Sequence, residues 1–256
     1  EKKTFVRPQN ILTAVISLLK LEKVLIYAFE KKTKDELSYN IEETIFELTK
    51  LPLLLDVMAI CPITDIDLEI LLTDIRSILL SHILNSNKIN NLLKFQSALA
   101  LQCFTNEYIY NFGDHDVQNI NKLEKKIIKI LSNDQQPHPN LILCLASYYP
   151  LHKFKWINSL NVNLHIKKVF ERQVIEVKEQ IFIKNKIKIL TEVKNTVSSK
   201  VRSQYENSPY PRWVNIGLPY KYSTISRVIF DLKLNLFNNE IKNIESPNIL
   251  IAGCGT

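Results

Sequence analysis

The fold class is decided by the stretch Thr64-Asp65-Ile66-Asp67-Leu68-Glu69-Ile70-Leu71-Leu72-Thr73-Asp74-Ile75-Arg76-Ser77-Ile78-Leu79-Leu80-Ser81-His82-Ile83-Leu84. Pro62 interrupts the chain just before it. The Thr64 hydroxyl can cap the amide of Asp67, whose carboxylate can return the bond as in a capping box. Apolar residues then recur at helical spacing, as a stripe of Leu68, Leu71, Leu72, Ile75, Ile78 and Leu79. We therefore predict a helix from Thr64 to about Leu84.

The same periodicity extends in both directions, so that residues 9–200 predict one helix after another. We expect helices over about 88–112, ending near Gly113, and over about 116–131. Pro137 and Pro139 should open a short helix that ends before Pro150, and two helical stretches should fill about 162–188. No fixed-period repeat is evident. The sequence thus predicts a mainly α fold, with a helical domain over 1–190.

The character of the chain changes after residue 190. A short helix is expected over Val197–Tyr205, but Ser208, Pro209 and Pro211 then exclude regular structure. Residues 191–245 are expected to form a connector with one more helix near 223–237. Residues 246–256 hold the apolar run Ile249-Leu250-Ile251-Ala252, which is typical of a buried parallel strand.

Composition limits the class of protein. The chain is 46% hydrophobic, which is enough for a sizeable core, and it has no uncharged apolar run long enough to span a membrane. Its net charge of +7 lies in residues 151–200, where eleven basic residues face four acidic ones. Such a patch could bind nucleic acid or another anion. We favour a solvated lysine-rich face, because arginines and interleaved aromatic residues are scarce there.

The cysteines predict no metal site. They form no C-x-x-C pair and no zinc-finger spacing, and we expect buried, reduced thiols in a cytoplasmic protein; they are Cys61, Cys103, Cys144 and Cys254. The chain starts at Glu1 without an initiator methionine or a signal peptide. We expect a piece of a longer protein.

Glycine carries the clearest chemical signal. The chain has only four glycines, and Gly253 and Gly255 directly follow the predicted strand. A strand followed by G-x-G is how nucleotide-binding α/β folds cradle a cofactor, because glycine lets a ligand approach the backbone. Alone the pattern is weak, since the third glycine and the acidic residue of the dinucleotide fingerprint would lie beyond Thr256. A β-turn after a strand is the alternative.

Longer motifs add a family resemblance. Asn248-Ile-Leu-Ile-Ala-Gly-Cys-Gly-Thr256 resembles the first motif of class I S-adenosylmethionine-dependent methyltransferases, a hydrophobic strand followed by A-G-C-G-T-G. Val201-Arg-Ser-Gln-Tyr-Glu-Asn-Ser-Pro-Tyr-Pro-Arg-Trp213 resembles the V-R-x-Q-Y-E-x-x-P-Y-P-R-W signature, which precedes the methyltransferase domain in a bacterial family, some of whose members carry tetratricopeptide repeats. Residues 67–76 and 98–108 resemble that family too, and Ser208 departs from its usual asparagine.

The resemblance implies that 246–256 begin a truncated Rossmann-like domain. Gly253, Cys254 and Gly255 would then approach S-adenosylmethionine, whose methyl group passes to a nucleophile. The resemblance implies that the catalytic core strands would follow Thr256 and leaves the catalytic residues unknown, so we expect these 256 residues to be inactive alone. The acceptor stays open, a protein being one candidate. The alternative is a helical protein–protein interaction module.

The segment from Tyr205 to Trp213 has two interpretations. As a lid over the cofactor it would use Tyr205, Tyr210, Arg212 and Trp213, with prolines for stiffness and aromatic faces to exclude water. As a rigid plug it would dock the helical domain on the sheet. Asn207-Ser-Pro-Tyr210 also resembles the N-P-P-Y box of DNA amino-methyltransferases, which follows a buried strand. Polar, helical residues precede it here, so nucleic acid is disfavoured as the substrate.

Gln102 and Asn106 interrupt an apolar helix on one face. They could line a substrate pocket. We favour a satisfied interhelical network with Arg76 or Asp74, because buried polar groups must be paired.

Overall fold

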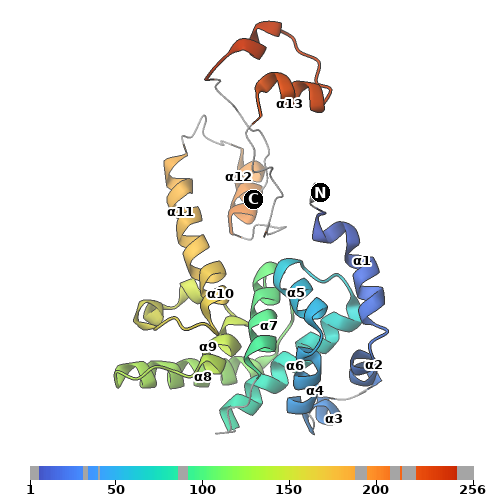
Figure 1. The fold of residues 1–256 in the computed structure, drawn as a ribbon. Coiled ribbons are helices and arrows are strands. Elements are labelled where there is room, and N and C mark those ends of the chain that lie inside the picture. Colours follow the sequence, from blue (N-terminus) through green and yellow to red (C-terminus); the bar gives the residue numbers. More distant parts are fainter. Residues whose placement is uncertain are drawn as a thin grey trace.

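The computed structural model describes residues 6–30, 34–39, 41–85, 92–187, 195–207, 214 and 223–246. Within these ranges the fold is helical and contains no strand, which confirms the mainly α prediction (Figure 1). The predicted strand at 249–252 lies outside the described residues.

Nine α-helices build the body: α1 (Pro8–Leu19), α2 (Lys23–Glu30), α3 (Lys34–Tyr39), α4 (Ile41–Thr49), α5 (Pro52–Ile60), α6 (Ile66–Asn85), α7 (Leu93–Thr105), α8 (Asp114–Ser132) and α9 (Pro139–Ala146), counted over the described ranges. Short helical turns η1 (Leu151–Lys153) and η2 (Lys155–Ser159) follow. Then α10 (Lys167–Phe170), the π-helical η3 (Glu171–Ile175) and α11 (Glu176–Lys186) run on without a break. The last elements are α12 (Thr196–Asn207), α13 (Ile225–Asp231) and η4 (Asn239–Asn243).

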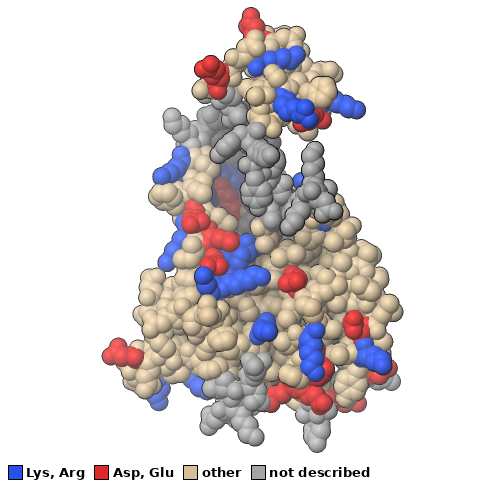
Figure 2. All heavy atoms as spheres, in the orientation of Figure 1, with Lys and Arg blue, Asp and Glu red and all other residues tan. Residues whose placement is uncertain are grey.

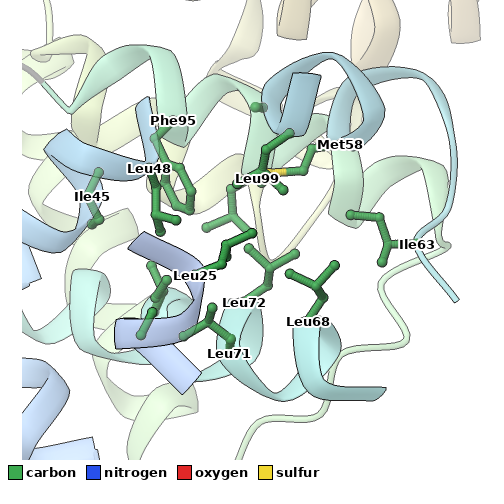
Figure 3. Close-up of a cluster of buried hydrophobic side chains, with 14 of the residues drawn as sticks. Leu25, Ile45, Leu48, Met58, Ile63, Leu68, Leu71, Leu72, Phe95 and Leu99 are labelled. Atoms are coloured by element: carbon green, nitrogen blue, oxygen red, sulfur yellow. The ribbon is translucent and has the colours of Figure 1, made fainter. Parts of the chain in front are cut away.

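Helices α6 and α7 lie in the middle of the body, between α1–α5 on one side and α8–α9 on the other (Figure 1). Two apolar clusters fill the interior. The first joins α1–α7 and is drawn in Figure 3 around Leu25, Leu48, Leu72 and Phe95. The second joins the far faces of α6 and α7 to α8, α9 and α10. The whole predicted stripe of α6 is buried, which confirms the face of this helix.

The predicted capping box at the start of α6 is wrong. The helix begins at Ile66, and the carboxylate of Asp65 accepts a hydrogen bond of 3.1 Å from the amide of Leu68. Asp67 instead binds the ammonium of Lys20 at 2.7 Å. A carboxylate is an N-cap at least as good as a threonine hydroxyl. The carboxylate of Asp65 is also attracted by the ammonium of Lys20. Thr64 lies one residue too early.

The expected helix over 88–112 is also wrong at its end, because α7 stops at Thr105. The backbone turns left-handed at Glu107 and Tyr108, both with φ of 58°. The amide of Tyr108 then donates to the carbonyl of Cys103 at 2.7 Å, and that of Glu107 to Phe104 at 3.3 Å, as in a Schellman closure. Because no glycine marks this turn, the pattern of apolar residues does not reveal it.

Other boundaries follow the predictions more closely. Helices α8, α9 and α12 lie where they were expected. One continuous helix over 167–186, with a π turn, replaces the two expected stretches over 162–188. Helix α13 is shorter than its predicted range. Among the described helices, none is long and apolar enough to cross a membrane.

Candidate functional site

Most of the predicted site residues lie outside the described part of the chain. Gly253, Cys254 and Gly255 of the cofactor motif are among them, and so are Tyr210, Arg212 and Trp213 of the signature segment. Tyr205 is described and occupies the last turn of α12, with 59% of its surface exposed. The geometry of the candidate site can therefore be built at α12, the helix that leads into the signature segment.

Helix α12 begins at a defined cap. The side-chain oxygen of Asn195 accepts hydrogen bonds from the amides of Val197 at 2.9 Å and Ser198 at 3.1 Å. This asparagine satisfies two donors that the first turn of a helix leaves without a partner, which sets where the helix starts.

The carboxylate of Glu206 ties α12 to α11. One oxygen accepts from Arg202 Nε at 2.7 Å within the helix, and the other accepts from Lys184 Nζ of α11 at 3.0 Å. Arg202 first, and Lys184 second, hold the pKa of Glu206 below its usual value. All three groups are solvent-exposed, so the contact contributes little to the stability of the fold. Sequence analysis missed it, because residues 184 and 206 are joined only through tertiary structure.

The buried polar groups around Gln102 are structural. With its amide oriented to suit its neighbours, Gln102 donates to the carbonyls of Cys61 at 2.9 Å and Met58 at 3.0 Å, and accepts from the amide of Ile63 at 2.9 Å. It therefore holds the chain between α5 and α6. The interpretation as an interhelical network is confirmed for Gln102, but Arg76 is not its partner. Among the described residues, the side chain of Asn106 only accepts a hydrogen bond of 3.1 Å from the amide of Tyr108.

Arg76 has a different task. Its guanidinium is almost fully buried and donates to the carbonyls of Tyr110 at 2.9 Å, Asn111 at 3.0 Å and Ser147 at 3.3 Å. It thereby joins α6 to the segments that follow α7 and α9. Such a group is committed to backbone carbonyls, so it is poorly placed to meet a substrate.

The described thiols are not nucleophiles. Cys61, Cys103 and Cys144 are free and buried, as predicted, whereas Cys254 lies outside the described residues. Burial raises the pKa of Cys103 to about 11 and that of Cys144 to about 12, even though Arg76 opposes both shifts. The thiolate is the reactive form, so these residues act as packing groups. No cluster of three or more metal-ligating side chains occurs in the part of the chain that the structure describes.

Acidic residues pair with several basic residues of the stretch 151–200. Figure 2 shows blue and red spheres intermingled over α10 and α11. Arg172 binds Glu176 at 2.6 Å, and Lys167 approaches Glu171 to 3.8 Å. These pairs place acidic groups among the basic ones, and the net charge of +7 already counts both glutamates.

A shallow groove of about 260 Å³ opens between α2 and α4. The residues that line it include Tyr27, Lys23, Glu43 and Glu47. Sequence analysis did not single out these residues, because the groove forms only when two short helices pack side by side.

Comparisons with protein-family models, with curated proteins and with solved structures found no match for this chain.

Proposed function

We propose that this chain is the N-terminal part of an S-adenosylmethionine-dependent methyltransferase. In this proposal residues 1–190 are a helical domain, residues 191–245 a connector, and residues 246–256 the start of a Rossmann-like domain that continues after Thr256. The methyltransferase-like motifs at 201–213 and 248–256 support the assignment. When bound, S-adenosylmethionine would supply a methyl group activated by its sulfonium.

The single structural observation in support is the position of Glu206. The glutamate of the signature segment contacts Lys184 of the helical domain at 3.0 Å, which places the end of α12 beside α11. A lid or plug needs such an anchor, because a fixed origin lowers the entropy lost when the segment closes. Gly253, Cys254 and Gly255 would approach the cofactor, and Tyr205, Tyr210, Arg212 and Trp213 would close over it.

Isothermal titration calorimetry with S-adenosylmethionine tests the proposal. The complete protein should bind the cofactor, and these 256 residues alone should bind it negligibly, since two glycines supply only one wall of the pocket. Clear binding by the 256-residue chain would place a site in the helical domain. No binding by the complete protein would exclude the methyltransferase assignment.

The lid and the plug differ in their response to substitution of Arg212. As a lid residue, Arg212→Ala should lower cofactor affinity or turnover and leave thermal unfolding unchanged, because an exposed arginine contributes little stability. Trp213→Ala should reduce both the activity and the thermal stability of the complete protein, because a large ring is lost. If Arg212→Ala unfolds the complete protein while its folded fraction stays fully active, the segment is a docking plug.

The groove between α2 and α4 favours a second candidate, a helical protein–protein interaction module. A partner segment with an apolar and a cationic side chain would suit Tyr27 and Glu43, whereas Glu47 already binds Lys50. If the sequence after Thr256 lacks a third glycine and an acidic residue at the end of a second strand, the module is the better assignment.

A further inference from the structure

Helix α8 carries nearly equal numbers of basic and acidic side chains. The basic ones are Lys122, Lys125, Lys126 and Lys129. The acidic ones are Asp114, Asp116 and Glu124. Because these charges almost cancel, the sequence of this helix does not reveal a basic region, and only the arrangement of the side chains around the helix axis does.

The lysines of α8 share one side of the helix. Successive residues of an α-helix point about 100° apart, so all four lysines fall within an arc of about 100°. The carboxylates lie elsewhere. Asp116 is buried and accepts a hydrogen bond of 2.9 Å from the Ser77 hydroxyl, Glu124 points to nearly the opposite side from Lys122, and Asp114 lies about two turns earlier, in the first turn of the helix. We call the four lysines the α8 lysine face.

This face is open to solvent. Lys122, Lys125 and Lys129 are exposed and Lys126 is half-buried, and α8 projects from the lower left of the body (Figure 1). The ammonium of Lys122 donates to the Asn119 side chain at 3.4 Å. Within the part of the chain that the structure describes, none of the four lysines forms an ion pair with a carboxylate. Their charges are therefore available to a partner.

The helix dipole accounts for only one of these lysines. Cations are stabilised near the C-terminus of a helix, but the effect falls off within the last turn. Of the four, only Lys129 lies in that turn. The positions of Lys122, Lys125 and Lys126 need another explanation.

The spacing of the charges fits a linear polyanion. From Lys122 to Lys129 the helix rises about 10 Å, so its four positive charges are on average about 3.5 Å apart along the axis. One strand of a nucleic acid duplex carries a phosphate about every 3.4 Å along its axis. The density of positive charge on this face therefore matches the density of negative charge on one strand.

The composition of the face selects among polyanions. The other positions on this side, His115 and Gln118, are exposed and polar. A helix that binds a lipid surface needs apolar side chains that enter the bilayer beside its lysines. A protein that binds single strands normally offers aromatic rings on which bases stack. The α8 lysine face has neither, which leaves the phosphates of a duplex as the best fit.

We infer that the α8 lysine face binds the phosphate backbone of a nucleic acid duplex without reading its sequence. Contacts to phosphates position a protein on a duplex and carry no sequence information directly. This inference goes beyond the proposed methyl transfer and does not depend on it. The duplex is a binding partner here and not the methyl acceptor.

Fluorescence anisotropy of the 256-residue chain with a labelled DNA duplex of about 20 base pairs, titrated at several salt concentrations, tests the inference. The logarithm of the association constant should fall with the logarithm of salt concentration with a slope of about −3.6, which corresponds to four neutralised phosphates. Lys122→Gln with Lys126→Gln, and separately Lys125→Gln with Lys129→Gln, should each weaken binding about tenfold at low salt and bring the slope to about −1.8.

The matched control is Lys233→Gln with Lys242→Gln, which removes the same charge from two exposed lysines after α12. It should change the affinity and the slope little. An equal loss in the control would show attraction to the net charge of the chain and overturn the inference. No binding of the duplex at low salt, tighter binding of a single strand, or binding only to phosphatidylserine vesicles would overturn it as well. Glutamine keeps the helix propensity of lysine, so the circular dichroism of both α8 variants should be unchanged, and each pair tests the face independently.

Discussion

The guanidinium carbon of Arg76 lies 4.4 Å from the ring centre of Tyr148. The two residues belong to α6 and to the turn after α9, and Phe112 adds a second ring at 5.5 Å. A buried cation between aromatic faces gains electrostatic stabilisation that water would otherwise provide. Arg76 thus stabilises the junction of α6, α7 and α9 from inside.

Replacing this arginine should damage the fold severely. Arg76→Ala leaves three carbonyls without a donor, and each buried unpaired group costs about 1–3 kcal/mol. We expect the free energy of unfolding in urea to fall by at least about 3 kcal/mol. Arg202→Ala removes an exposed pair and serves as the control, with an effect below about 0.5 kcal/mol. A loss below about 1 kcal/mol for Arg76→Ala would show that the junction is held by apolar packing alone.

Gln173 holds the π turn in a comparable way. Its amide nitrogen donates to the carbonyls of Ala100 and Ala146, both at 3.1 Å, and its oxygen accepts from the amide of Leu151 at 3.1 Å. Gln173→Leu keeps the volume but leaves these groups unpaired, and should lower stability by about 2–4 kcal/mol. Gln180→Leu on exposed α11 is the control. Equal denaturation midpoints for the two variants would contradict the assignment.

Several helices of this glycine-poor chain end at left-handed residues that carry side chains. Asp134 has φ of 56° after α8 and is exposed. Asp134→Gly removes the steric cost of that conformation, and we expect a gain of about 0.5–1 kcal/mol in thermal unfolding experiments. Asp134→Ala, whose Cβ remains, should give no gain. If both variants behave alike, backbone strain at this position is negligible.

The start of α6 should be sensitive to acid. Burial opposes ionisation of Asp65, but the ammonium of Lys20 at 2.7 Å and the amide of Leu68 outweigh it and hold the pKa of Asp65 below its usual value. This stabilisation is present above the pKa of the unfolded chain, about 3.9, and is lost as pH falls through the lower folded value. Asp65→Asn keeps an oxygen for Leu68 and removes the charge, so its unfolding free energy should depend less on pH below about 4.

Asp65→Ala separates the cap from the ion pair. It loses both, so at neutral pH it should be about 1 kcal/mol less stable than Asp65→Asn. If the acid dependence of the asparagine variant matches that of the unmodified chain, the pair with Lys20 is not the cause.

The sequence predicts some of these features and conceals others for physical reasons. The buried face of α6 follows from its repeat of leucine and isoleucine, because burial of apolar side chains drives folding and leaves a periodic trace in the sequence. The end of α7 leaves no such trace in the sequence, because the left-handed conformation there is adopted by Glu107 and Tyr108 and not by a glycine. The burial of Arg76 is equally hidden, because arginine is normally a surface residue and its partners are backbone carbonyls.

At the candidate site, too, the sequence predicts the local features but not the contact between distant residues. The helix that carries Tyr205 was predicted from local pattern, and its cap at Asn195 is a local feature too. The contact between Lys184 and Glu206 joins residues 22 apart in the sequence. One sequence does not record which lysine among many meets a given glutamate.

The last prediction concerns this contact in the complete protein. Glu206→Gln keeps the helix and its shape but removes the charge that binds Arg202 and Lys184, so α12 should lose its ion pair with α11. We expect weaker cofactor binding by calorimetry together with an unchanged thermal midpoint, because the exposed pairs contribute little to stability. Asp231→Asn breaks a similar exposed pair, with Arg227 on α13, and should leave binding unchanged. A drop in stability without a change in affinity would mean that Glu206 holds the helical domain together and does not position the signature segment.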